Sequence, residues 1–143
     1  MGGAGGVATL PTMLLLGAII IEIAIAMAFL TYYFNTIIYG SRLAAEALEV
    51  ARAGADEAVL RVIRDKNYSS VTPFTFTVSQ NPLRTANVQV CKDILCDSSL
   101  ANGKTEILST SAVLNRLARI RVILNVDATT GLVGVDAYEE KPL

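Results

Sequence analysis

The residues from Val7 to Tyr39 form an apolar stretch with one charged side chain, Glu22. The stretch is longer than the roughly 20 residues that a helix needs to cross a bilayer. A helix in the core of a soluble domain rarely remains apolar on every face over such a length. The sequence therefore predicts a helix that lies in lipid, or in a core built by several copies of itself.

Glu22 raises the question of a partner, because a carboxylate among apolar side chains is costly and is normally paired. Every Lys and Arg lies at or after Arg42, and the chain has no His. No basic side chain of the same chain is therefore close to Glu22 in sequence. Two alternatives follow: the partner belongs to another molecule, or the carboxyl group is protonated and hydrogen-bonded within a helix bundle.

From Ser41 onward the predicted helix changes character without stopping. Small and apolar residues recur at helical spacing and predict one buried stripe, made of Ala44, Leu48, Ala51, Ala55, Ala58, Val59 and Val62. Opposite charges four residues apart predict ion pairs on the exposed side, namely Arg52–Asp56, Glu57–Arg61 and Arg61–Asp65.

The apolar period becomes two after a break predicted over Asn67–Pro73, which indicates β-strands. We expect strands over residues 74–79, 88–90, 104–110, 116–126 and 132–138. Asn81-Pro82 and Asp127–Gly131 predict turns, and Asp97–Gly103 a loop.

These elements predict an α+β fold: a long N-terminal helix packed on a small C-terminal antiparallel sheet, whose inner face needs the helix stripe to be buried. We expect the helix over residues 1–66, with an apolar segment over 7–40 and an amphipathic segment over 41–66. Residues 67–143 form a β-rich head. The chain has 143 residues, so only one small domain can follow the helix.

Two short features in the second half are candidate modification sites. Cys91 and Cys96 lie close together, which predicts a short-loop disulfide in a domain facing an oxidising space, or a pair of free thiols in a cytosolic domain. Asn67-Tyr68-Ser69 fits an N-glycosylation acceptor.

Several function classes find little support. The absence of His excludes histidine-based catalysis and histidine metal sites. The GGAGG run follows no predicted strand and is no phosphate-binding loop, and no basic patch accompanies an aromatic stacking surface for nucleic acid. We predict no catalytic residue, no metal ligand and no cofactor.

The layout of the whole chain resembles type IV pilins and pilin-like proteins. The stretch Gly17-Ala18-Ile19-Ile20-Ile21-Glu22 is similar to the prepilin processing site, in which a glycine precedes the cut and a glutamate stands fifth after it. The stretch from Ala44 to Ile63 is similar to the helix of PilX-like minor pilins.

The resemblance implies processing after Gly17 and a role in filament assembly for Glu22, which would pair with the N-terminal amine of a neighbouring subunit. The residues before Gly17 are hydrophobic, whereas a pilin leader is short and basic, and Ala18 replaces the usual aromatic residue. Processing near Gly6, or before Met1, is the alternative.

The resemblance further implies a structural subunit of an extracellular filament. Its partners would be other copies of itself in a helical homopolymer, the cytoplasmic membrane before assembly, and the pilus assembly machinery. The alternatives are a pseudopilin of a secretion system and a non-polymerising single-span membrane protein with an extracytoplasmic binding domain.

The charge distribution gives a conflicting expectation for orientation. Arg42 and Arg52 follow the apolar stretch and no basic residue precedes it, which by the positive-inside rule places the C-terminal part in the cytoplasm. A basic leader located before Met1 would reconcile this pattern with an exported head.

Overall fold

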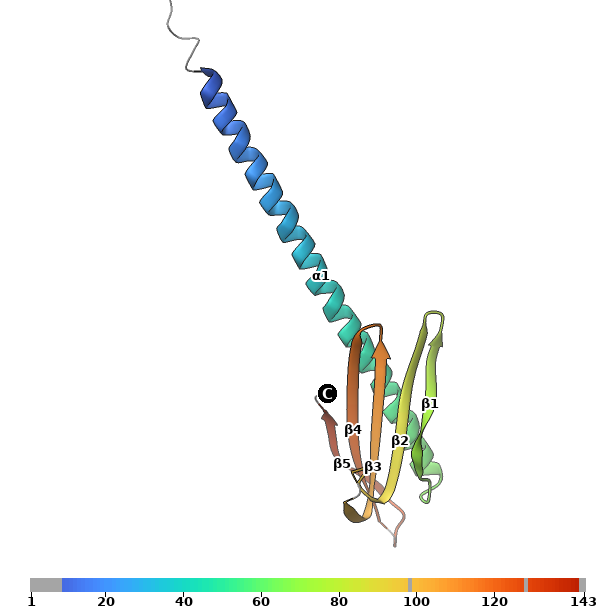
Figure 1. Cartoon of the computed structure of the whole chain (residues 1–143). Helices are drawn as coiled ribbons and strands as arrows, with labels where there is room; N and C mark the ends of the chain where they lie inside the picture. The colour runs from blue at the N-terminus through green and yellow to red at the C-terminus, as the bar shows by residue number, and fades with distance from the viewer. Residues whose placement is uncertain (1–8, 98, 128, 142–143) are drawn as a thin grey trace, which may run out of the picture. The chain divides into compact units, whose positions relative to one another are not determined.

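The computed structural model describes residues 9–97, 99–127 and 129–141 and has the predicted α+β architecture (Figure 1). One helix is followed by a five-stranded antiparallel sheet in which the strands lie in chain order. The elements are α1 (Thr9–Arg64), β1 (Ser70–Gln80), β2 (Leu83–Ile94), β3 (Leu100–Val113), β4 (Arg116–Val126) and β5 (Val133–Glu140).

The chain divides into two compact units, Met1–Gly40 and Ser41–Leu143. We call them the N-terminal unit and the head unit. The described part of the N-terminal unit is the first part of α1, in which Pro11 lies in the first turn, where backbone N–H groups have no helical partner in any case. The head unit contains the rest of α1 and the whole sheet.

The core of the head unit lies between one face of α1 and the inner face of the sheet. Its buried apolar residues come from the helix and the three central strands: Leu43, Ala47, Val50, Ala51, Ala55, Ala58, Val62, Ala86, Val88, Val90, Ile107, Val113, Ala118, Ile120, Val122 and Leu124. The helix contributes mostly small side chains, so the sheet can approach its backbone closely.

The predicted helix stripe is correct in its C-terminal half and wrong at its start. Ala51, Ala55, Ala58 and Val62 are fully buried, whereas Ala44 is exposed. The buried face instead begins with residues that the sequence pattern did not single out, namely Leu43, Ala47 and Val50. The pattern of small residues is too uniform in this region to specify which side faces the sheet.

The strands extend further than predicted. The break predicted over Asn67–Pro73 is wrong in its second half, because β1 runs through Pro73; a proline is tolerated there since β1 is an edge strand with one unpaired side. The loop predicted over Asp97–Gly103 is also too long, because Leu100 already pairs with Ile94 of β2.

Both predicted turns are present. The first contains a cis peptide bond between Asn81 and Pro82. In the second, the N–H of Gly131 donates to the carbonyl oxygen of Asp127 at 2.8 Å. Gly131 has φ of 68°, a conformation that favours glycine.

Of the three predicted ion pairs on α1, the described residues form only the second. Arg61 Nε donates to Glu57 Oε1 at 2.9 Å. Arg52 instead bonds to Glu49, with Nη1 and Oε1 2.8 Å apart. The third pair is absent: Arg61 bonds to Glu57 and Tyr68, and Asp65 Oδ1 accepts the backbone N–H of Asn67 at 2.9 Å.

Candidate functional site

The apolar part of α1 in the N-terminal unit is the first candidate site. All its large apolar side chains are exposed, with exposed fractions from 44% for Ile19 to 74% for Tyr32. The helix that carries them is long and apolar enough to cross a membrane. Apolar surface of this extent on an isolated chain requires a cover, either lipid or another protein surface.

Two polar side chains in this segment are satisfied by the helix itself. Thr31 Oγ1 donates to the carbonyl oxygen of Met27 at 2.8 Å, and Thr36 Oγ1 donates to that of Tyr32 at 3.0 Å. Such bonds to the preceding turn remove the need for water at a hydroxyl. The two threonines are therefore compatible with an apolar environment.

Glu22 has no such partner. Its side chain is exposed and forms no hydrogen bond or ion pair within the described ranges 9–97, 99–127 and 129–141. The residues one helical turn away, Ala18, Ile19, Ile25 and Ala26, offer no polar side chain. Any donor to this carboxyl group must therefore come from outside the described part of the helix.

Of the two candidate processing residues, the structure describes only Gly17. Gly17 is helical, and a Cβ added there would meet no atom within 4 Å. Packing within the described chain therefore gives no reason for a glycine at this position. Gly6 lies outside the described residues.

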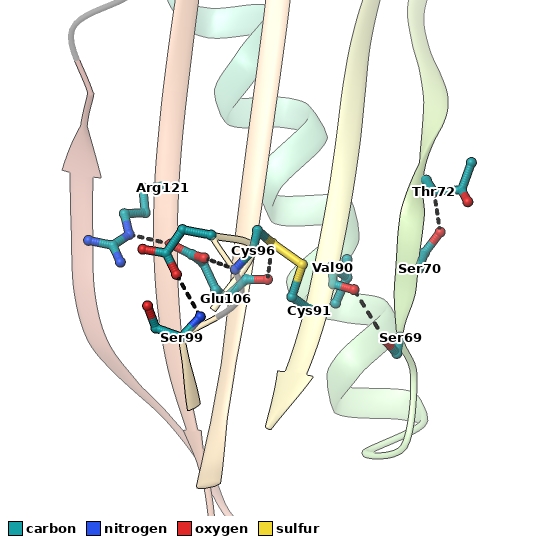
Figure 2. The surroundings of a disulfide bond; sticks show 10 residues. Ser69, Ser70, Thr72, Val90, Cys91, Cys96, Ser99, Glu106 and Arg121 are labelled. Carbon is teal, nitrogen blue, oxygen red and sulfur yellow. Dashed lines mark hydrogen bonds and ion pairs between the residues drawn. A yellow bond between two sulfur atoms is a disulfide. The ribbon is translucent and has the colours of Figure 1, made fainter. Parts of the chain in front are cut away.

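Cys91 and Cys96 form a disulfide in the head unit, with an S–S distance of 2.11 Å and a Cα–Cα distance of 5.4 Å. Cys91 lies on β2 and Cys96 in the loop that follows (Figure 2). A second bond closes this loop, since the N–H of Leu95 donates to the carbonyl oxygen of Ser99 at 2.7 Å.

A buried carboxylate, which the sequence analysis missed, fixes the disulfide loop to the sheet. Glu106 Oε2 accepts the backbone N–H of Cys96, and Glu106 Oε1 accepts Nε of Arg121 on β4 (Figure 2). The Glu106 side chain is only 3% exposed and that of Arg121 19%. Ile107 belongs to the core, so the alternation along β3 places Glu106 on the opposite face of the sheet.

The arrangement around Glu106 is structural in character. Each carboxylate oxygen has a donor, one from the loop backbone and one from a guanidinium, so the negative charge is compensated in a site almost closed to water. The signal in the sequence was a lone acidic residue in the middle of β3, two residues after Lys104. Its arginine partner could not be identified without the pairing of β3 with β4.

Asn67, the candidate glycosylation residue, is exposed in the turn after α1. Its side-chain oxygen accepts a hydrogen bond from Lys92 Nζ at 2.5 Å. Asn67 is one of the residues that line a cleft of about 600 Å³. The lining residues are Lys66, Asn67, Lys92, Asp93, Gly103, Thr105, Val126, Asp127, Thr129, Thr130 and Gly131. The two lysines and two aspartates balance each other, so the cleft favours neither an anion nor a cation.

In this cleft the Asp127 carboxylate is engaged by its own turn. Its Oδ1 accepts the backbone N–H groups of Thr129 at 2.7 Å and Thr130 at 3.1 Å. These bonds, with that of Thr130 as the largest cause, lower the pKa of Asp127 below its usual value of 3.8. The carboxylate therefore acts as a turn cap rather than as a free ligand.

Within the described part of the chain, no group of three or more Cys, Asp or Glu side chains is arranged to hold a metal ion. Comparison with known proteins gave no match to a family model, to a curated protein or to a solved structure.

Proposed function

We propose that this protein is a structural subunit of an extracellular filament of the type IV pilus kind, which polymerises through its apolar N-terminal helix. Copies of the chain would reside in the cytoplasmic membrane before assembly, and the pilus assembly machinery would transfer them into a helical homopolymer. The observation that carries the proposal is the apolar helix segment from Leu10 to Tyr39, whose large side chains are exposed on all faces.

An apolar surface on all faces suits both stages of such a life cycle. In the bilayer, lipid covers every side of the helix. In a filament core, neighbouring helices of other copies do the same, and association depends on packing and on polar groups that meet between helices. The same sequence therefore serves as a membrane anchor and as a polymerisation element.

Glu22 favours polymerisation over a simple anchor. It lies near the middle of the apolar segment, where a carboxyl group in lipid is expensive. No described residue of its own chain meets it. A donor from a neighbouring copy would offset this cost in a filament, whereas a solitary anchor would retain the cost permanently.

The proposal can be tested by electron microscopy of material sheared from cells that express the full chain, with mass spectrometry of the N-terminal peptide. We expect thin filaments that contain this chain, and the peptide would identify cleavage after Gly17 or near Gly6. A chain found wholly in the membrane fraction, without filaments, would instead support a single-span protein with an extracytoplasmic domain. A short periplasmic polymer that appears with secretion components would support a pseudopilin.

The role of Glu22 can be separated from membrane insertion by two variants. Glu22→Ala should be inserted normally, as judged by resistance to carbonate extraction, but should give few filaments. Glu22→Gln keeps the size and hydrogen-bonding capacity without the charge, so filaments from this variant would indicate a neutral hydrogen bond rather than an ion pair. Normal filaments from Glu22→Ala would remove Glu22 from the mechanism.

A further inference from the structure

Two hairpin turns at one end of the head unit carry exposed leucines. Leu83, the first residue of β2 after its turn, is 65% exposed. Leu114 lies in the turn between β3 and β4 and is 72% exposed, and Leu117, the second residue of β4, is 59% exposed. None of these side chains contributes to the core of the head. Their presence on the surface therefore has no explanation in the stability of the head itself.

These turns lie at the end of the head unit where its helix segment begins (Figure 1). Ser111 of β3 donates a hydrogen bond to the carbonyl oxygen of Ala47. Leu114 lies three residues further along, roughly 10 Å, which corresponds to about seven residues of helix. This places the turn beside the first residues of the helix segment in the head unit. Arg84, next to Leu83, is bonded to Glu46 at 2.5 Å and places the other turn at a similar level.

The backbone at Leu114 also argues against a purely local role. Leu114 has φ of 54°, in the left-handed region that glycine, asparagine and aspartate adopt most easily. A leucine there bears a backbone penalty and exposes most of its apolar side chain to solvent. An apolar partner outside the head would give this side chain a function.

The charges at this end are basic. Arg42 and Arg116 are exposed, and the nearby Glu46 is engaged by Arg84. Glu49, the next acidic residue along the helix, is paired with Arg52. The opposite end of the head has charges of both signs: its exposed leucines, Leu100 and Leu132, are accompanied by the aspartates 93, 97 and 127 and by the lysines 66, 92 and 104.

We propose that Leu83, Leu114, Leu117, Arg42 and Arg116, which we call the tip surface, rest on a bilayer that contains anionic lipids before the subunit enters a filament. Ser41 directly follows the apolar segment in the chain, so chain connectivity keeps this end of the head close to the membrane face at which that segment ends. The leucines enter the interface, and the arginines bind lipid phosphates. This inference rests on the membrane stage of the proposed function.

The absence of tryptophan from the chain allows a direct test with single tryptophan probes. The full-length variants Leu114→Trp and Leu117→Trp are reconstituted in phosphatidylcholine–phosphatidylglycerol vesicles with lipids brominated near the top of the acyl chain. Leu100→Trp and Leu132→Trp are matched controls at the opposite end of the same head. Phe34→Trp reports insertion of the apolar segment.

We expect strong quenching of the probes at 114 and 117 and little quenching at 100 and 132. Adding Arg42→Gln and Arg116→Gln, or omitting phosphatidylglycerol, should reduce quenching at 114 without changing it at 34. Equal, weak quenching at 114 and 100 with strong quenching at 34 would contradict the proposal that the tip surface rests on the bilayer, while leaving the membrane stage intact. A probe at 114 that is shielded only in filaments would assign this surface to contacts between copies and also overturn it. Loss of quenching at 34 would contradict the membrane stage and the tip surface together.

Discussion

Gly54 of α1 faces Ala86 of β2 so closely that a Cβ added to the glycine would lie 2.6 Å from the Cβ of the alanine. Ser109 Oγ would be 2.7 Å from the same added atom. Helix and sheet therefore meet at a point where neither has room for another carbon atom. This contact explains why small residues dominate the buried face of the helix.

Gly54→Ala should destabilise the head unit by about 1–3 kcal/mol, because an added methyl group in a filled core forces backbone or side-chain shifts. The sign is informative, since the same substitution in an exposed helix would stabilise by roughly 1 kcal/mol. Chemical denaturation of the full chain in detergent, followed by circular dichroism, measures the change. Gly134→Ala is the control, because a Cβ there would meet nothing within 4 Å; an equal loss in both variants would refute the close contact.

Two buried serines on β3 should respond differently to replacement by alanine. Ser111 Oγ donates to the carbonyl oxygen of Ala47, so Ser111→Ala should cost about 0.5–1.5 kcal/mol. The hydroxyl of Ser109 is buried and has no hydrogen-bond partner among the described residues. Ser109→Ala should therefore be neutral or stabilising, since it removes an unsatisfied polar group. A larger loss for Ser109→Ala than for Ser111→Ala, in the same denaturation experiment, would contradict this assignment.

Glu106 and Glu139 provide a matched comparison, because both approach the same arginine. Glu106 bonds to Arg121 in a site almost closed to water, whereas Glu139 is 4.0 Å from Arg121 with a side chain that is 59% exposed. Glu106→Gln should destabilise by about 1.5–3 kcal/mol, as expected for a hydrogen bond that involves charged groups.

For Glu139→Gln the expected change is below about 1 kcal/mol, as for an exposed ion pair. The Glu106 variant should also speed hydrogen exchange at the Cys96 amide, which loses its charged acceptor, while Glu139→Gln should leave that rate unchanged. Similar effects of the two substitutions would show that burial of Glu106 has no energetic consequence.

The lowered pKa of Asp127 predicts a contribution to stability that depends on pH. Because the folded state favours the charged carboxylate, the contribution is fully present above the usual value of 3.8 and is lost as the pH falls through the lower pKa of the folded state. Asp127→Asn retains a hydrogen-bond acceptor but no charge.

The variant should therefore be less stable than the parent chain at about pH 6, and the difference should shrink from about pH 4 downward. Thermal unfolding across this range tests the expectation. The pKa of Asp97 is also lowered, chiefly by the backbone N–H of Ser99. The stability of Asp127→Asn should therefore still fall somewhat in acid, and adding Asp97→Asn should reduce this remaining dependence on pH. A difference that does not change with pH would exclude the turn carboxylate as its source.

The sequence was sufficient to predict the main elements, because their signals are local. The apolar run and the recurrence of small residues specify a helix, and the strict alternation from Ile120 to Val126 specifies β4 with its inner face. The turn at Asp127–Gly131 follows from residue types that favour it, and Gly131 has the expected positive φ.

The features that were missed depend on pairing between distant parts of the chain. Leu100 belongs to β3 because Ile94 lies opposite it across the disulfide loop, although the Asn and Gly that follow Leu100 suggest a loop. Glu106 acquires its role from Arg121 on the next strand. The predicted helix stripe was wrong at Ala44 because alanines occur on several sides of the helix in this region. Only contact with the sheet selects Leu43 and Ala47 as the buried side.

The chain-order arrangement of β1 to β5 has a consequence for folding kinetics. Each strand pairs with the strand that immediately precedes it, so every pairing closes a short loop at small entropic cost. Only the docking of the helix onto β2, β3 and β4 joins residues far apart in sequence, which keeps the contact order low for a β-rich fold. A chain that emerges in order, from the ribosome or across a membrane, can therefore pair each new strand with one already present.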